Sequence, residues 1–303
     1  MEQSVICLEQ VAKSFSGVPV ISDLSFTVRK GEILGFLGPN GSGKTTTIRL
    51  LNGVITADAG QITVAGFDPV TAGNEVRKRC GVLTESAALY GQMTALENLL
   101  FFAELYGVSE PKARAEELLA TCGLRDARHK KVAVFSTGMK KRLGIAKALL
   151  HQPEILFLDE PTTGLDPEGA KSLIHYIKEL NRTCGVTILL ATHQLKQVEE
   201  LCHRFLFLDH GRLLEIGTFN ELAEKYLTAV SIKVETDLEI AGPEFKGFQL
   251  ENKFPGYLQF KVERKEEIPI LLKELLAVGP VYSSVILGRD LETLYFRLKE
   301  EKA

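Results

Sequence analysis

Short apolar runs that end at glycine or polar residues predict the buried strands of a parallel sheet. The clearest runs are Ile33–Leu37, Ile155–Leu158 and Val186–Leu190. Strands buried on both faces are continuously apolar rather than alternating, because helices cover both faces of the sheet. A helical pattern follows the first run over 45–51, and another precedes the second run and ends near Leu150. We therefore predict an α/β fold built on a parallel sheet.

The pattern changes after Lys225. Apolar and polar residues alternate over 229–236 and 257–262, which is the period of a strand. Two amphipathic helices and a further strand are predicted over 266–277, 290–299 and 281–287. We predict a first domain over residues 1–225 and a small α+β domain over 226–303. The second domain has no chemical motif, so we expect it to stabilise a dimer or to regulate the first domain.

Composition and charge narrow the range of functions. The chain has 303 residues, 45% of them apolar and 25% charged, which is ordinary for a globular protein with a full core. Its net charge of −3 argues against nucleic acid as the main partner, because binding to phosphates favours a basic face. The five cysteines are scattered and form no C-x-x-C pair, so we expect reduced thiols in the cytoplasm.

Nothing in the pattern predicts a membrane span or a secretion signal. No apolar run approaches the roughly 18–20 residues that cross a bilayer. Residues Met1–Ser4 lack the charged and then apolar pattern of a signal peptide.

The segment Gly38–Thr45 fits the phosphate-binding P-loop pattern G-x-x-x-x-G-K-[ST], between a predicted strand and a predicted helix. Glycines let the backbone N–H groups of such a loop point inward, and the helix N-terminus faces the anion. Lys44 is expected to reach the β- and γ-phosphates and Thr45 to bind Mg²⁺. We conclude that the chain binds a nucleoside triphosphate. The residues expected to contact it are Gly38, Pro39, Asn40, Gly41, Ser42, Gly43, Lys44, Thr45 and Thr46.

Two acidic residues follow the apolar run Ile155–Leu158. The C-terminal ends of parallel strands form the ligand-binding edge of an α/β sheet. Asp159 is suited there to hold Mg²⁺, directly or through water, and Glu160 to polarise the water that attacks the γ-phosphate. The alternative is a strand that ends in solvated acids before a turn at Pro161. With a P-loop upstream, the catalytic interpretation is favoured.

A histidine and a second helix start complete the set. His193 follows the run Val186–Leu190 and is expected at the same edge of the sheet. A lone histidine after a strand is usually structural, but here it could sense the γ-phosphate and orient Glu160 and the water. Ser136 and Gly138 precede a helical pattern, and a serine and a glycine at a helix N-terminus form a second anion site.

In this order, the motifs resemble those of the nucleotide-binding domain of ATP-binding-cassette (ABC) proteins. The matching segments are the P-loop, Ser136-Thr137-Gly138 at the LSGGQ signature, Leu158–Pro161, Gly164–Pro167 at the D-loop and His193. The resemblance covers residues 1 to about 225. It implies a RecA-like core with a helical subdomain over about 86–150, and hydrolysis of ATP with Mg²⁺. It also implies that Phe15 stacks on adenine.

The resemblance also implies partners. In this family two cassettes pair head to tail and enclose ATP between the P-loop of one and the signature helix of the other. Lys44 and Glu160 would therefore act in one chain, while Ser136 and Gly138 act from a second nucleotide-binding subunit, for which we expect a homodimer. A transmembrane permease subunit on a separate chain is also implied, with this chain at the cytoplasmic face of the cell membrane.

Two positions depart from the family pattern. Thr137 stands in the signature where the family has glycine. Glu85 stands at the Q-loop position, where it can still accept a hydrogen bond from a metal-bound water but adds a negative charge. Both variants, and the C-terminal segment Leu291–Tyr295, are similar to those of bacterial drug- and sodium-exporter ATPases. The resemblance thus implies an exporter ATPase with Thr45, Glu85 and Asp159 around the metal.

Two other classes of function fit parts of the chain. Soluble ABC ATPases that act on ribosomes or DNA usually carry two cassettes in one chain or long insertions, and neither is present here. A regulatory module that holds ATP without turnover is compatible with Thr137 and Glu85. The presence of both Glu160 and His193 argues against such a module. The sequence therefore favours the exporter ATPase.

Overall fold

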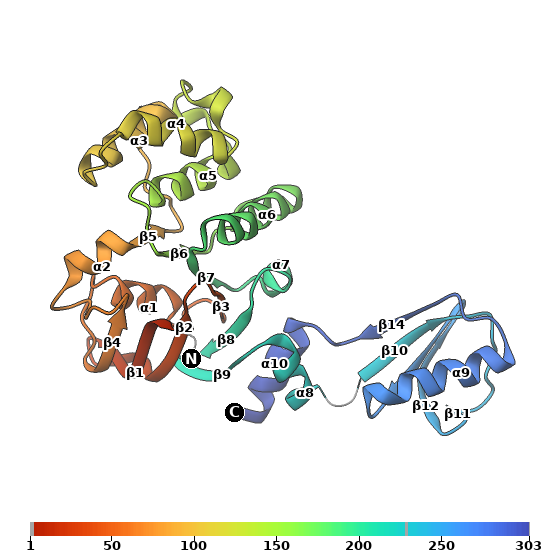
Figure 1. Cartoon of the computed structure of the whole chain (residues 1–303). Coiled ribbons are helices and arrows are strands. Elements are labelled where there is room, and N and C mark those ends of the chain that lie inside the picture. The colour runs from red at the N-terminus through yellow and green to blue at the C-terminus, as the bar shows by residue number, and fades with distance from the viewer. Residues whose placement is uncertain (1–2, 228–229, 303) are drawn as a thin grey trace. The chain divides into compact units, whose positions relative to one another are not determined.

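The computed structural model describes residues 3–227 and 230–302. The chain forms two compact units, which divide between Ile216 and Gly217 (Figure 1). The sequence pattern places the division after Lys225 instead. The difference is helix α8 (Phe219–Tyr226), which contacts the last helix α10 (Leu291–Lys302) and therefore belongs to the second unit.

A six-stranded sheet forms the centre of the first unit, with the strand order β5-β6-β7-β3-β8-β9. Its strands span Cys80–Leu83 (β5), Ile155–Asp159 (β6), Thr187–Thr192 (β7), Ile33–Leu37 (β3), Arg204–Asp209 (β8) and Arg212–Gly217 (β9). The pairs from β5 to β8 are parallel, as predicted, and β3, β6 and β7 are buried along their whole length. This order brings the C-terminal ends of β3, β6 and β7 to one edge, although they are far apart in the sequence.

A second, antiparallel sheet of three strands lies in the same unit, in the order β2-β1-β4. These strands span Ser4–Phe15 (β1), Val18–Arg29 (β2) and Ala59–Val64 (β4). Ile6 and Val28 from this sheet join Phe36 and Phe157 of the central sheet in one hydrophobic cluster. The cluster also contains Ile48 of helix α1 (Lys44–Leu51), so the helix that follows the P-loop is anchored in the core.

The chain between β5 and β6 forms a group of helices (Figure 1). It contains α3 (Ala95–Leu105), α4 (Pro111–Thr121) and α5 (Thr137–Ala148), with 3-10 turns η1 (Arg125–Ala127) and η2 (Val132–Val134). A capping box starts α3: the Thr94 hydroxyl accepts from the Glu97 N–H, and the Glu97 carboxylate accepts from the Thr94 N–H. The three helices contact one another, and α5 also contacts β5 of the central sheet.

Three further helices complete the first unit, namely α2 (Gly73–Arg79), α6 (Pro167–Cys184) and α7 (Leu195–Val198). The sequence sets both ends of α6. The Asp166 carboxylate accepts from the Gly169 N–H at its start, and Gly185 ends it with a φ of 63°. In the part of the chain that the structure describes, no helix is both long enough and apolar enough to span a bilayer.

The second unit is a five-stranded sheet with the order β11-β12-β13-β10-β14. Its elements after α8 are β10 (Val230–Glu235), β11 (Glu244–Phe245), β12 (Phe248–Phe254), β13 (Tyr257–Val262), η3 (Lys265–Glu267), α9 (Ile268–Val278), β14 (Ser283–Leu287) and α10. Leu271 and Leu275 of α9 pack on Ile232 and Phe260 of the sheet in a separate hydrophobic cluster. The predicted α+β organisation is confirmed.

Candidate functional site

The P-loop connects β3 to α1, and its glycines meet two backbone requirements. Gly43 caps α1 with a φ of 107°, in the left-handed region that favours glycine. A Cβ at Gly38 would lie 2.2 Å from the carbonyl oxygen of Leu208 on β8, so any side chain there would push the loop off the sheet. A Cβ at Gly41, in contrast, would meet no atom within 4 Å. The loop is therefore packed against the sheet at its start and open at Gly41.

Lys44 is buried beside this loop, with only 6% of the residue exposed. Its Nζ donates to the carbonyl oxygens of Gly38 at 2.8 Å and Pro39 at 3.0 Å. Burial lowers the pKa of Lys44, while the nearby carboxylates of Glu160 and Asp159 raise it. An ammonium group held by neutral carbonyls at the start of a helix is well placed to bind a phosphate.

Thr45 and Asp159 form a polar pair at the end of β6. Thr45 Oγ1 donates to Asp159 Oδ2 at 2.8 Å. Asp159 is 6% exposed, and its other oxygen, Oδ1, has no hydrogen-bond partner among the described residues. Burial raises the pKa of Asp159, and the hydrogen bond from Thr45 partly offsets that effect. A buried carboxylate oxygen without a partner, next to a hydroxyl group, fits a hard cation such as Mg²⁺.

Glu160 lies directly after this pair and is held at several points. Its backbone is left-handed, with a φ of 49°, and its N–H donates to the carbonyl of Ala191 on β7 at 2.9 Å. The carboxylate oxygen Oε1 is 2.8 Å from His193 Nδ1 and 3.8 Å from Lys44 Nζ. Oε2 accepts from Thr192 Oγ1 at 3.1 Å. A backbone conformation that is rare for a glutamate thus aims its carboxylate at the cation of the P-loop.

One cavity of about 490 Å³ joins these groups. It is lined by Val20, Asn40, Gly41, Gly43, Lys44, Thr45, Thr46, Glu85, Asp159, Glu160, Thr163 and His193. Three P-loop residues of the predicted set are not among them. Gly38 and Pro39 turn their carbonyls to Lys44, and Ser42 is 2% exposed with no hydrogen-bond partner for its hydroxyl among the described residues.

Phe15 lies outside this cavity, at the end of β1. The residue is 44% exposed, and Lys13 Nζ lies 5.4 Å from its ring centroid. Lys13 is also paired with Asp58 at 2.6 Å, which fixes the cation beside the ring. An exposed aromatic ring of this kind offers a surface on which a base can stack.

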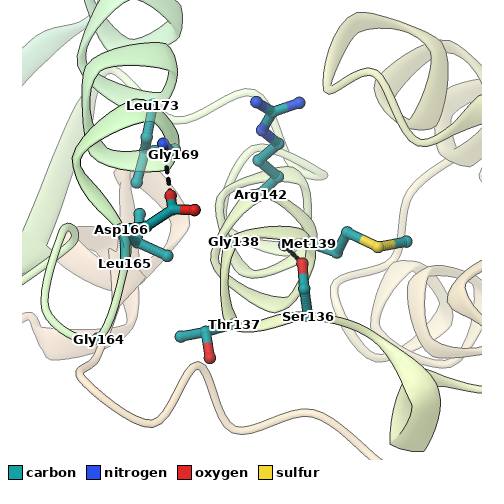
Figure 2. A pocket seen from close by; sticks show the side chains of 10 residues that line it. All are labelled: Ser136, Thr137, Gly138, Met139, Arg142, Gly164, Leu165, Asp166, Gly169 and Leu173. Carbon is teal, nitrogen blue, oxygen red and sulfur yellow. Dashed lines mark hydrogen bonds between the residues drawn. The ribbon is translucent and has the colours of Figure 1, made fainter.

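Ser136 and Gly138 line a second cavity of about 490 Å³, shown in Figure 2. It lies between the start of α5 and the start of α6, and the Ser136 hydroxyl caps α5 by accepting from the Met139 N–H at 3.2 Å. A Cβ at Gly138 would meet nothing closer than Leu165 Cδ2 at 3.5 Å. Packing within this chain therefore does not require a glycine at 138. The open space fits a ligand that approaches from outside the chain.

The structure also adds residues that the motifs did not assign. Val20 and Thr163 line the first cavity, and Thr163 Oγ1 lies 3.3 Å from Glu160 Oε2. Thr192 precedes His193 and donates to the same carboxylate oxygen. The position of Thr192 at the end of a buried strand can be predicted from the sequence, but the direction of its side chain cannot. Val20 comes from β2, whose pairing the sequence pattern does not predict.

Comparison with known proteins identifies the family. The family model described as ABC transporter matches residues 21–163. The linearmycin resistance ATP-binding protein LnrL of Bacillus subtilis is 38% identical, over 72% of this chain and 70% of its own length. An uncharacterized ABC transporter ATP-binding protein of the same organism, YhcH, is 34% identical over 99% of this chain and 97% of its own. The Nod factor export ATP-binding protein I of Burkholderia pseudomallei is 39% identical over 80% and 79%.

Solved structures agree on the fold. The protein cbiO1 of Clostridium perfringens, part of the ABC transporter complex cbiONQ, aligns with a TM-score of 0.68 at 26% identity, over 75% of this chain and 94% of its own. A dimeric ATP-binding cassette bound to ADP and Pi has the same fold, with a TM-score of 0.64 at 23% identity over 70% and 98%. With the P-loop, the acidic strand end and these relatives together, the chain belongs to the ATP-binding proteins of the ABC transporter family, which are ATP hydrolases.

Proposed function

We propose that this chain is the ATPase subunit of an exporter and drives a membrane-spanning subunit carried on a separate chain. Its place would be the cytoplasmic face of the cell membrane. The names of two relatives support export: LnrL is a linearmycin resistance protein, and the other relative is a Nod factor export ATP-binding protein. The match to YhcH extends over nearly the whole chain, so the second unit also has a counterpart in that relative.

Exposed apolar residues on the helical segment support a protein partner. Tyr90, Phe101 and Tyr106 are 49%, 40% and 44% exposed, and Leu105 is 69% exposed. The rings of Tyr90 and Phe101 pack edge to face, with centroids 5.2 Å apart. Grouped exposed aromatic residues are typical of protein interfaces rather than of solvated helices. We assign this surface to the membrane subunit.

The contacts around Glu160 support distinct roles for the residues of the first cavity. Lys44 would bind the β- and γ-phosphates and neutralise the charge that develops during transfer. Glu160 would orient the attacking water and accept its proton, and His193 would hold the Glu160 carboxylate through the 2.8 Å contact. This carboxylate, which lines the first cavity and contacts His193, Thr192 and Lys44, is the observation that carries the proposal.

Thr45 and Asp159 would hold Mg²⁺, with Glu85 lining the same cavity. The bound ion would supply positive charge that offsets the negative charge of the phosphates. No cluster of three or more His, Cys, Asp or Glu side chains with metal-ligand geometry occurs in residues 3–227 and 230–302. A site for Mg²⁺ needs no such cluster, because Mg²⁺ in phosphate-transferring proteins is bound by one or two carboxylates together with the substrate phosphates.

We assign the second cavity to the nucleotide of a partner cassette. The N-terminus of α5 and the Ser136 hydroxyl offer hydrogen bonds to an anion, and the space in front of Gly138 leaves room for its approach. Thr137 lines the same cavity, and its Cγ2 would lie 3.4 Å from a Cβ placed on Gly164 at the D-loop side. A second copy of this chain would supply these groups in a homodimer.

The replacement Glu160→Gln tests the catalytic assignment. It keeps the shape of the side chain but removes the proton acceptor, so we expect ATP binding to stay within about twofold while turnover falls about a hundredfold or more. Glu154→Gln is the matched control, because Glu154 precedes the same strand at its opposite end and its side chain is 55% exposed. Turnover by Glu160→Gln equal to that of the control contradicts the assignment.

The membrane partner is tested by purifying the native complex from solubilised membranes. We expect a polytopic membrane subunit to copurify with the chain. Recovery with ribosomes or DNA enzymes instead, and without a membrane protein, contradicts the proposal of an exporter.

A further inference from the structure

Lys141 on helix α5 is a buried lysine for which the catalytic scheme has no role. Only 4% of the residue is exposed, although it lies in the basic run Lys140-Lys141-Arg142. Its Nζ donates to two backbone carbonyls from different parts of the fold, that of Glu85 at 2.8 Å and that of Glu160 at 3.0 Å. A lysine is almost never fully buried unless it is paired, so these contacts need an explanation.

The contact with Glu160 acts on the strained part of the site. Glu160 has a left-handed backbone, which costs a residue with a long side chain on the order of 1 kcal/mol or more. Its N–H donates to the carbonyl of Ala191, and its C=O accepts from Lys141 Nζ at 3.0 Å, with a longer contact from the Thr163 N–H at 3.4 Å. These contacts hold the residue at both of its peptide groups. Rotation of either peptide would redirect the carboxylate.

Three carboxylates lie near the Lys141 ammonium group, and they indicate an electrostatic role for this lysine. Burial lowers its pKa, and the charges of Glu85, Asp159 and Glu160, in that order, raise it again. These are the three carboxylates that line the first cavity. Lys141 is therefore the cation that the helical segment contributes beside the acidic groups of the site, in addition to Lys44 from the P-loop. It also offsets the negative charge that Glu85 adds.

We infer that Lys141 is a positioning residue for ATP hydrolysis, which locks the backbone of Glu160 in its left-handed conformation and links it to the Q-loop and to the signature helix. The inference rests on the proposed role of Glu160 as the group that orients the attacking water. Because α5 also begins with Ser136 and Gly138, one helix carries both the groups for the partner's nucleotide and the clamp on this chain's own glutamate.

The test replaces Lys141 by methionine, glutamine and arginine in the full-length chain, with ATPase activity and binding of a fluorescent ATP analogue measured for each. Lys141→Met removes both the charge and the hydrogen bonds, so kcat is expected to fall about ten- to a hundredfold, as for displacements of about 1 Å in a site. KM and the affinity for the analogue are expected to stay within about twofold, because Lys141 does not line the cavity. Lys141→Arg keeps a donor and a charge and is expected to recover most of kcat.

Lys147 provides the matched control, since it is a second buried lysine on the same helix, 8% exposed. Its Nζ donates to the carbonyls of Ala87 and Ala88 instead of to Glu160. We expect Lys147→Met and Lys141→Met to change thermal stability by similar amounts. Lys147→Met should, however, change kcat by less than about threefold. Equal losses of kcat in both variants overturn the inference, as does a Lys141→Met protein with the kcat of the wild type.

A second pair of variants covers the case in which Lys141→Met does not fold. Lys141→Gln keeps a donor without the charge, and adding Glu85→Gln removes the carboxylate that the lysine offsets. We expect the double variant to be more active than Lys141→Gln alone, and no recovery contradicts the role of charge. Absence of ATPase activity in the wild-type chain would instead count against the proposed function.

Discussion

Replacing Asp159 by asparagine is expected to make the isolated protein more stable and the Mg-ATP complex less stable. The carboxylate is 6% exposed, one of its oxygens has no partner among the described residues, and the charge of Glu160 follows directly in the chain. Burial raises the pKa of Asp159, so its ionised form opposes folding at neutral pH. A neutral side chain of the same shape removes that cost, which is about 1–2 kcal/mol for a partly compensated buried charge.

The sign of the pH dependence follows from the direction of this pKa. A carboxyl group whose folded-state pKa lies above the unfolded value of 3.8 stabilises the fold below 3.8 and loses that contribution as the pH rises through the folded-state pKa. The advantage of Asp159→Asn should therefore be largest at neutral pH and shrink as the pH is lowered.

Calorimetry in EDTA and in Mg-ATP, from pH 5 to pH 8, measures both effects. With Mg-ATP the wild type gains stability from ligand binding, by RT ln(1 + [L]/Kd), while the variant should gain much less because it lacks the carboxylate for the metal. Asp209→Asn is the control, since Asp209 ends strand β8 of the same sheet and is 8% exposed. A variant that is less stable than the wild type in EDTA at pH 7 refutes the reasoning, and so does a normal response to Mg-ATP.

Two further predictions concern the helical segment. Burial lowers the pKa of Lys147 from 10.5 to about 8, so between these pH values the unfolded state binds more protons than the folded state. The wild type should therefore gain stability relative to Lys147→Met as the pH rises from 7 to 9.5. Denaturant unfolding of both proteins measures this difference in stability. The buried thiols Cys80 and Cys122 contribute a pH dependence of opposite sign, which is the same in both proteins and cancels in the difference. A stability difference that does not change with pH contradicts the prediction. Asn98 is fully buried and makes three hydrogen bonds, one from the Tyr90 N–H and two to the carbonyls of Tyr90 and Thr94, so Asn98→Leu should lower the free energy of unfolding by about 2–4 kcal/mol. Unfolding of that variant at the wild-type denaturant midpoint would show that the segment around Tyr90 does not depend on these bonds.

The sequence predicts those parts of the structure whose signal is local. The apolar runs become the buried strands β3, β6 and β7, and the polar residues after them meet at one edge because parallel strands share an orientation. The P-loop pattern places Lys44 and Thr45, since its glycines fix the backbone over a few residues. The domain boundary is less well predicted, although the capping box of Thr218 and Glu221 marks the start of α8 in the sequence.

Other features depend on contacts between distant segments. The strand β1 was not predicted, because shifts in its pairing with β2 interrupt the alternation of buried and exposed residues along it. Lys141 shows the same limit for the site. In the sequence it stands in a run of charged residues that is typical of a solvated helix start, yet two carbonyls from other elements receive its ammonium group. The residues around position 141 therefore give no indication that these two carbonyls accept from Lys141.

With the two cavities assigned as proposed, these contacts offer a route by which Glu160 would respond to two nucleotides. The Glu160 N–H donates to β7, and its carboxylate contacts Thr192 at the end of β7 and His193 directly after it. Its C=O accepts from Lys141 of α5 and, at 3.4 Å, from the Thr163 N–H. Of these supports, only Lys141 comes from the helical segment, which also carries the exposed residues that we assign to the membrane subunit. A shift of α5, whether caused by a nucleotide at Ser136 or by a partner at Tyr90, would therefore act on the Glu160 carboxylate through the Lys141 ammonium group. Coupling by this route requires no movement of the P-loop, which remains packed against β8.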